Sequence, residues 1–284
     1  MSYQTLINAA DLARLVEQGN VLVYDCRFDL ADPDAGRHAY RAGHIPGAVY
    51  VDLERDLSAV PTGRNGRHPL PDRAGFAARM AGLGMMRDGL VVSYDDSGGY
   101  YASRLWWMLR WAGHSQVAVL DGGLNAWTES GRVLEEGEAS VSPGDFGASR
   151  APAMPVSEVE AIEANLSSGE LLVVDARTAE RFAGAPHPLD TASGHIPGAG
   201  NRFWQHNLTP EGRFKSAAEL AREFGELLEG RAAGTIVHQC GSGVTATHNL
   251  LAMEVAGLTG SRLYPGSWSE WTSDPRRPIA RDAD

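Results

Sequence analysis

Short apolar runs of four or five residues alternate along this chain with longer stretches in which apolar residues recur every three or four positions. Apolar runs of this length are typical of strands in a parallel sheet, because helices cover both faces of such a sheet. The longer stretches have the period of amphipathic helices. The pattern therefore predicts an α/β fold with mainly parallel sheets flanked by helices. The expected strands are 21–25, 90–94, 117–120, 171–175, 235–239 and 261–264, and the expected helices are 72–84, 100–113, 216–230 and 243–257.

The order of these elements repeats within the chain. The hexapeptide GHIPGA occurs at 43–48 and again at 194–199, and VLVYD and LLVVD precede it at matching distances. A repeat of this length indicates two copies of one structural unit. Between the copies lies a stretch rich in Gly, Ser, Pro and Ala, a composition typical of linkers. We predict a first domain over 1–138, a linker over 139–156 and a second domain over 157–284.

The start of the second copy has the signals of a helix. Ser157 and Glu160 have the spacing of a capping box, in which each side chain bonds a free backbone N–H of the first turn. Apolar residues follow at helical spacing, and Gly169 is predicted to end the helix.

Composition and charge remove several classes of function. Hydrophobic residues make up 43% of the 284 positions, which is enough for a packed core in each half, and the formal net charge is −11. No basic stripe indicates binding of nucleic acid or of an anionic membrane. The two cysteines form neither a disulfide framework nor a multi-cysteine metal site. With no signal-peptide pattern at residues 1–19 and no run long enough to span a membrane, we expect a cytoplasmic protein.

The duplication separates features of the fold from features of the chemistry. A residue present in both copies is expected to be structural, whereas one present in a single copy is a better candidate for catalysis. The shared residues are the histidines of the GHIPGA segments and the Asp and Arg that follow the preceding strands, namely His44 and His195, Asp25 and Arg27, and Asp175 and Arg177.

The two copies differ where a central strand meets the next helix. The strand at 235–239 leads to Cys240 and the loop Gly241-Ser242-Gly243-Val244-Thr245, whereas the matching strand of the first copy leads to Asp95. Loops after parallel strands line the ligand crevice of such sheets. A glycine-rich turn into a helix directs several backbone N–H groups to one point and favours an anion there, such as a thiolate. Cys26 has no such loop and is expected to be structural.

This set of residues resembles the two-domain form of the rhodanese family of sulfurtransferases. The resemblance covers the whole chain and implies tandem rhodanese-like domains, the first without a catalytic cysteine. The loop from Cys240 to Thr245 is similar to that of 3-mercaptopyruvate sulfurtransferases, because thiosulfate-specific members typically carry a basic pair where this chain has Gly241 and Ser242.

The resemblance also implies roles for individual residues. Cys240 takes up sulfur as a persulfide, Arg181 holds the anionic substrate, and Ser242 polarises or protonates it. His68 is expected to form a proton relay with Ser242 across the domain interface, and Glu54 is expected to complete that relay. The remaining loop residues bind the substrate or persulfide through their backbone: Gly241, Gly243, Val244 and Thr245. No metal and no organic cofactor is implied.

One position departs from the family pattern. Many mercaptopyruvate enzymes carry a second carboxylate-binding arginine shortly before the second GHIPG segment, and Leu189 stands near that position here. The donor is therefore open between 3-mercaptopyruvate and thiosulfate. The expected partners are this small-molecule donor and an acceptor, either cyanide or a thiol such as thioredoxin or a low-molecular-weight thiol.

Two further alternatives have other chemistry. A phosphatase or arsenate reductase uses a similar strand–cysteine–loop–helix arrangement but needs an arginine six positions after the cysteine, where this chain has Ala246. A non-catalytic sulfur-binding module fits the first copy but does not explain a cysteine in a glycine-rich loop.

Overall fold

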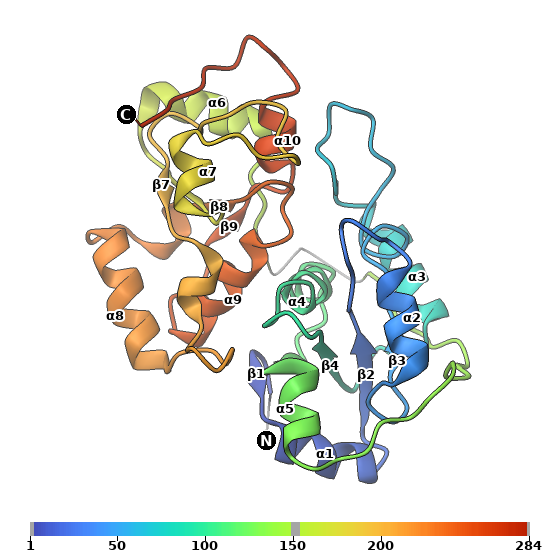
Figure 1. The fold of residues 1–284 in the computed structure, drawn as a ribbon. Coiled ribbons are helices and arrows are strands. Elements are labelled where there is room, and N and C mark those ends of the chain that lie inside the picture. Colours follow the sequence, from blue (N-terminus) through green and yellow to red (C-terminus); the bar gives the residue numbers. More distant parts are fainter. Residues whose placement is uncertain (1–2, 149–153, 283–284) are drawn as a thin grey trace. The chain divides into compact units, whose positions relative to one another are not determined.

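The computed structural model describes residues 3–148 and 154–282, and the chain divides into two units (Figure 1). The first unit consists of Met1–Ser58, Pro71–Ala153 and Pro210–Phe214. The second consists of Ala59–Leu70, Met154–Thr209 and Lys215–Asp284. The segment 59–70, which falls within the first domain predicted from the sequence, thus packs with the second unit. Residues 149–153 of the predicted linker 139–156 lie outside the described residues.

The first unit contains a parallel sheet of five strands, which occur in the order β1-β5-β4-β2-β3. The central strands β2, β4 and β5 are three of the predicted apolar runs. All four neighbouring pairs are parallel, in agreement with the predicted fold class. The strand bounds are Leu6–Ile7 (β1), Val21–Asp25 (β2), Val49–Tyr50 (β3), Leu90–Tyr94 (β4) and Val117–Leu120 (β5).

Helices cover both faces of this sheet (Figure 1). Side chains alternate between the faces of a strand, so neighbouring residues show which helix covers which face. Val23 packs in the cluster that holds α1 and α5, whereas the hydroxyl of Tyr24 donates to the carbonyl of Leu83 after α3. The bounds are Ala9–Glu17 (α1), Ala35–Ala42 (α2), Arg73–Gly82 (α3), Ala102–Trp111 (α4) and Gly123–Glu129 (α5).

The second unit repeats this plan with four parallel strands in the order β7-β6-β8-β9. In Figure 1, α6 and α10 lie on one side of the strands and α8 and α9 on the other. The strands are Leu172–Asp175 (β6), Gly200–Asn201 (β7), Ile236–Gln239 (β8) and Arg262–Leu263 (β9). The helices are Val159–Ser168 (α6), Ala179–Ala183 (α7), Ala217–Leu228 (α8), Ala246–Val255 (α9) and Ser267–Trp271 (α10), with short 3₁₀ turns at Trp204–Asn207 (η1) and Ala233–Thr235 (η2).

The predicted capping box is the local expectation that the structure contradicts. Helix α6 begins after Glu158 and no side chain caps it, because Ser157 is recruited instead by the sheet edge, where its N–H donates to the carbonyl of Leu263 at 2.8 Å. The predicted end of the helix is confirmed, since Gly169 is its C-cap with a left-handed φ of 63°.

The residues shared by the two halves have the structural roles expected of them. His44 and His195 are buried, and their Nδ1 atoms each lie 2.8 Å from the carbonyl oxygen of a residue in the preceding helix, Tyr40 and Phe182. The two Asp-Arg pairs are also buried, and each arginine extends from its strand to the glycine of a GHIPGA turn. Arg27 bonds Asp25 and the carbonyl of Gly43, and Arg177 bonds Asp175 and the carbonyl of Gly194.

The first unit places a carboxylate where the second has its cysteine. Asp95 follows β4, is fully buried and accepts four backbone N–H groups at 2.8–2.9 Å. The donors come from the loop and the first turn of α4: Ser97, Gly99, Tyr101 and Ala102. The turn between this strand and this helix therefore binds an anion that belongs to the chain itself.

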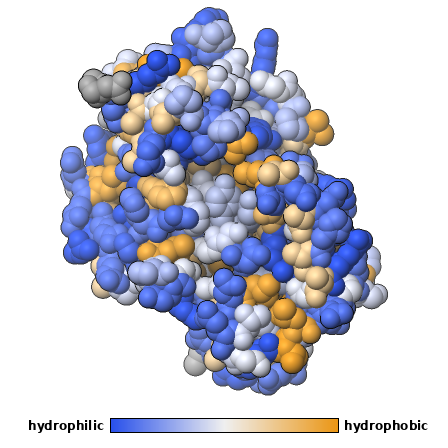
Figure 2. Space-filling model, in the orientation of Figure 1, coloured by the Kyte–Doolittle hydropathy of each residue, from blue (hydrophilic) through white to orange (hydrophobic). Residues whose placement is uncertain are grey.

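Polar side chains predominate on the surface shown in Figure 2, with apolar patches between them. Among the described residues, no helix is both long enough and apolar enough to cross a bilayer.

The buried His238 makes stability depend on pH. Burial lowers the pKa of His238 to about 3, from an ordinary value of 6.5, so the folded protein keeps this ring neutral. Below pH 6.5 the unfolded chain gains a proton that the folded chain cannot bind, and stability falls as the pH drops from 6.5 towards 3. We expect His238 to lower the free energy of unfolding by about 2 kcal/mol between pH 7 and pH 5.

Urea unfolding at the two pH values measures this loss, and His238→Gln is the control because glutamine does not titrate. The pH dependence of the variant should be smaller by that amount. An equal pH dependence in both proteins would contradict a neutral buried ring.

Candidate active site

The candidate nucleophile lies where β8 ends. Cys240 follows this strand directly, and the backbone N–H of Gly243 donates to its Sγ at 3.1 Å. Gly243 has a left-handed φ of 78°, and a Cβ atom at this position would lie 2.3 Å from the carbonyl oxygen of Pro265. Only glycine fits this turn, and the turn brings the N–H group to the sulfur. One loop amide faces the thiol. The expected convergence of several loop amides on the sulfur stays a prediction.

The rest of the loop continues into α9. Val244 and Thr245 are buried and form the step before the helix, which begins at Ala246. The positive end of the helix dipole therefore lies near the cysteine. Cys240 as a whole residue is only 2% exposed.

Ser242 and His68 form the predicted pair. The Nδ1 atom of His68 lies 2.8 Å from Oγ of Ser242, and both side chains are buried. His68 belongs to the segment 59–70 of the second unit, so the pair forms within that unit. A hydroxyl two residues from the thiol, bonded to an imidazole, can donate a proton to a reacting group and recover it.

Glu54, the predicted third member of this relay, belongs to the first unit. Its side chain is exposed, and its backbone N–H donates to the carboxylate of Asp52 at 2.9 Å. A role for Glu54 in the relay stays a prediction.

Arg181 lies on α7 and approaches the loop from the side of β6. Its Nε and Nη2 bond both carboxylate oxygens of Asp190, at 2.9 and 2.7 Å. Its Nη2 also lies only 3.2 Å from the position that a Cβ of Gly241 would occupy. The guanidinium group is thus held in place by Asp190 and lies against the residue that follows the nucleophile.

Arg67 was missed by the sequence analysis. Its Nη2 lies 3.3 Å from the same Cβ position of Gly241, so two guanidinium groups meet at this glycine. Nη1 of Arg67 donates to the backbone carbonyl of Leu189 at 2.7 Å, and its buried Nε has no hydrogen-bond partner among the described residues. The side chain of Leu189 is apolar and cannot bind a carboxylate. Its backbone carbonyl instead holds the guanidinium group of Arg67. The available signal was the arginine directly before His68.

The charge of these groups affects a neighbouring histidine. Burial is the largest cause that lowers the pKa of His187, and Arg181, Arg67 and Arg177 lower it further, while Asp190 opposes them. Three arginines and one aspartate thus act electrostatically on this side of the loop. No group of three His, Cys, Asp or Glu residues in the described chain is placed to hold a metal ion.

A family model described as the rhodanese-like domain matches residues 8–130 and 158–274, which include both halves of the duplication. The chain belongs to the rhodanese-like family. Sequence relatives of this rhodanese-like protein include a probable 3-mercaptopyruvate sulfurtransferase of Pseudomonas aeruginosa, 46% identical over 282 residues and 99% of each chain. They also include a putative thiosulfate sulfurtransferase of Mycobacterium tuberculosis, 39% identical over 98% of this chain and 97% of that one.

Comparison with a solved structure also supports the rhodanese-like fold. The 3-mercaptopyruvate sulfurtransferase SseA of Escherichia coli matches with a TM-score of 0.81 at 33% identity, over 94% of this chain and 99% of that one. Full-length matches to enzymes of one class identify this rhodanese-like protein as a sulfurtransferase.

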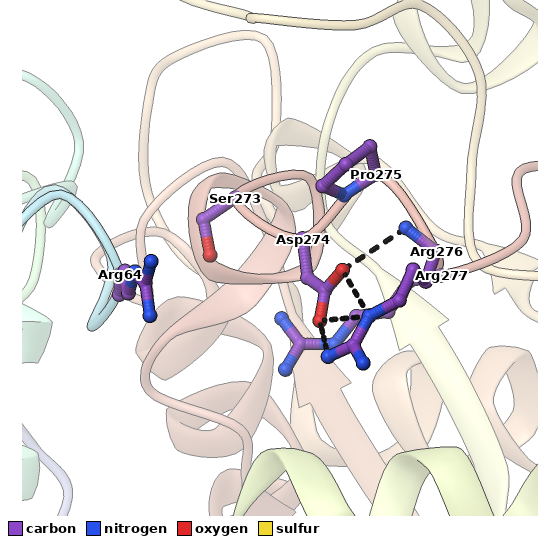
Figure 3. A pocket seen from close by; sticks show the side chains of 6 residues that line it. All are labelled: Arg64, Ser273, Asp274, Pro275, Arg276 and Arg277. Atoms are coloured by element: carbon purple, nitrogen blue, oxygen red, sulfur yellow. Dashed lines mark hydrogen bonds and ion pairs between the residues drawn. The ribbon is translucent and has the colours of Figure 1, made fainter.

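A cavity of about 440 Å³ lies elsewhere on the second unit, between Arg64 and residues 273–277 (Figure 3). Two of its three arginines are already paired. Arg276 bonds both oxygens of Asp274, and Nε of Arg277 bonds Glu163 at 2.7 Å. The paired arginines of this cavity offer little charge to a ligand, unlike Arg67 beside Gly241.

The contact at Gly241 generates a test. In Gly241→Ala of this rhodanese-like protein, the new methyl group meets both guanidinium groups at 3.2–3.3 Å. We expect the arginines to shift and kcat/KM for the donor to fall about 10- to 100-fold, because small misplacements of binding groups have effects of this size. Steady-state kinetics and a thermal melt measure the two effects separately.

The matched control is Gly225→Ala in α8, where a Cβ meets nothing within 4 Å. It should retain full activity. Unchanged kinetics in Gly241→Ala would show that the two arginines do not need their present positions.

Proposed function

We propose that this sulfurtransferase accepts sulfur from 3-mercaptopyruvate, or from a closely related thiol that carries a carboxylate, and holds it as a persulfide on Cys240. The observation that carries the proposal is the convergence of Arg67 and Arg181 on Gly241, the residue beside the nucleophile. Two guanidinium groups at one place suit a carboxylate, which each can bind through two hydrogen bonds. The relatives named for 3-mercaptopyruvate support the same donor.

In the first step the Cys240 thiolate attacks the sulfur of the donor. An S–S bond forms, the C–S bond breaks, and its electron pair passes to the carbon to give the enolate of pyruvate. The sulfur that remains on Cys240 is a persulfide, and its negative charge faces the N–H of Gly243 and the start of α9.

Ser242 and His68 manage the proton of this step. The enolate oxygen is where charge develops, and the Ser242 hydroxyl donates a hydrogen bond or a proton to it. His68, 2.8 Å from the serine, replaces that proton with the one released from the thiol of the donor as the persulfide anion forms. Enolpyruvate then leaves and tautomerises to pyruvate.

In the second step a thiol acceptor attacks the outer sulfur and releases the Cys240 thiolate. A small thiol or the exposed dithiol of a thioredoxin-type protein supplies this nucleophile, and cyanide can replace it. Both cysteines of the chain are free, which suits the reducing cytoplasm where such thiols are abundant. Two half-reactions with a covalent intermediate give ping-pong kinetics.

Mass spectrometry tests the intermediate directly. After incubation with 3-mercaptopyruvate and no acceptor, we expect the intact protein to gain the mass of one sulfur atom, and Cys240→Ser to gain none. Addition of dithiothreitol should remove the added mass. The absence of any adduct with either 3-mercaptopyruvate or thiosulfate would instead support a module that only binds sulfur compounds.

Arg67→Ala tests the identity of the donor. We expect kcat/KM for 3-mercaptopyruvate to fall about 10- to 100-fold, mainly through KM, because a charge-assisted hydrogen bond to the carboxylate is lost. Arg222→Ala in α8 is the matched control, since this exposed arginine pairs, within the described parts of the chain, with Glu223 and Glu226 of its own helix. A higher kcat/KM for thiosulfate than for 3-mercaptopyruvate in the wild-type protein would make thiosulfate the donor.

A further inference from the structure

Ser267, the first residue of α10, has an unusual backbone conformation. Its φ is +53°, in the left-handed region that favours glycine. Among the described non-glycine residues, only Glu229 shares this feature, and Glu229 is an exposed helix C-cap. Ser267 is fully buried, so solvent exposure does not explain its conformation. Strained residues of this kind persist where the surrounding structure requires them, and they cluster at functional sites.

The contacts of Ser267 lead to the nucleophile. Its Oγ accepts the backbone N–H of Cys240 at 3.1 Å and donates to the carbonyl of Tyr264 at 2.9 Å. The next residue continues this set of bonds, because the N–H of Trp268 donates to the carbonyl of Cys240 at 3.0 Å. Both peptide groups that flank the Cα of Cys240 are therefore held by residues 267–268.

The following residue connects the same element to the substrate side of the site. The N–H of Ser269 donates to the carbonyl of Gly241 at 3.0 Å, and its Oγ accepts the backbone N–H of Arg67 at 3.0 Å. Residues 267–269 thus hold Cys240, Gly241 and the segment 59–70, which carries Arg67 and His68.

The first half of the chain provides an internal comparison. Gly123 occupies the matching position with a φ of +57°, and the N–H of Leu124 donates to the carbonyl of Asp95 at 2.8 Å. The backbone arrangement is the same, but there is no side chain, and a Cβ on Gly123 would lie 2.2 Å from that carbonyl. Glycine is thus compatible with the fold at this position, and the backbone hydrogen bond to the preceding loop still forms. The serine, with its strained backbone, occurs in the half that has the cysteine.

From this contrast we infer that Ser267 is a positioning residue for Cys240. Its hydroxyl fixes the N–H of Cys240 at the point where the chain leaves β8, and this orients the Cα–Cβ bond so that Sγ meets the N–H of Gly243. Ser267 acts through the backbone of the cysteine and does not touch the substrate. The inference rests on Cys240 as the nucleophile of the proposed function.

Ser267→Gly separates positioning from folding. Glycine adopts the left-handed conformation without strain, which offsets the loss of the two hydrogen bonds of the hydroxyl, so we expect the melting temperature to stay about the same. Because the hydroxyl is lost, kcat for sulfur transfer should fall about tenfold, the effect of roughly one hydrogen bond in the transition state. KM for the donor should not change, since Arg67 and Arg181 are intact. Glu229→Gly is the matched control, because it removes the same strain and should keep the wild-type kcat.

Reaction of the thiol with iodoacetamide gives a second readout that does not require the proposed donor. Mass spectrometry of the peptide that contains Cys240 should show slower alkylation at pH 7 in Ser267→Gly than in the wild-type and Glu229→Gly proteins. Ser267→Ala, which keeps the strain and loses the hydroxyl, should be alkylated as slowly and should also melt at a lower temperature.

The outcomes distinguish the inference from the proposed function. A wild-type kcat and alkylation rate in Ser267→Gly would overturn the positioning role, as would a lower melting temperature with unchanged alkylation of the folded protein. If the wild-type protein forms no persulfide while the alkylation rates differ as expected, the proposed function fails and the positioning of the thiol stands.

Discussion

Two carboxylates and two guanidinium groups form a continuous network in the second unit, and the candidate site depends on it. Asp175 at the end of β6 binds Arg177, Arg177 reaches Asp190 at 3.4 Å, and Asp190 binds Arg181 through both of its oxygens. Charges removed from water are costly unless they are paired in good geometry, so the network tolerates few other arrangements. Through it, the position of Arg181 beside the loop is fixed relative to the sheet that carries the cysteine.

The sequence was most informative where chemistry depends on neighbouring residues. Cys240 and its glycine-rich loop follow a strand directly, and local geometry alone brings the N–H of Gly243 to the sulfur. The duplication helped further, because it separated this loop from its counterpart at Asp95. The strands were predicted within one or two residues for the same reason, since buried parallel strands have a clear apolar signature. The two-residue strands β1, β3 and β7 have no such signature.

The features of the site that could not be predicted from the sequence are contacts between residues far apart in the chain. The approach of Arg67 to Gly241 arises because residues 59–70 pack with the second unit, and no periodicity predicts that placement. The pairing of Ser242 with His68 was predicted only from family resemblance. The strained backbone of Ser267 is equally invisible in composition, although the exchange of Gly123 for serine between the copies was a usable signal. Repeats are most informative where they disagree at a position whose backbone conformation favours glycine.

The carboxylate of Asp95 has a consequence for how the protein withstands its own reaction. A cysteine that carries sulfur passes through thiolate, persulfide and, under oxidative stress, sulfenic and higher acids, each with a different size and charge. Asp95 has none of these states, and its carboxylate accepts four amide N–H groups of its loop and helix start. One half of the molecule is therefore chemically inert at the position where the other half is reactive.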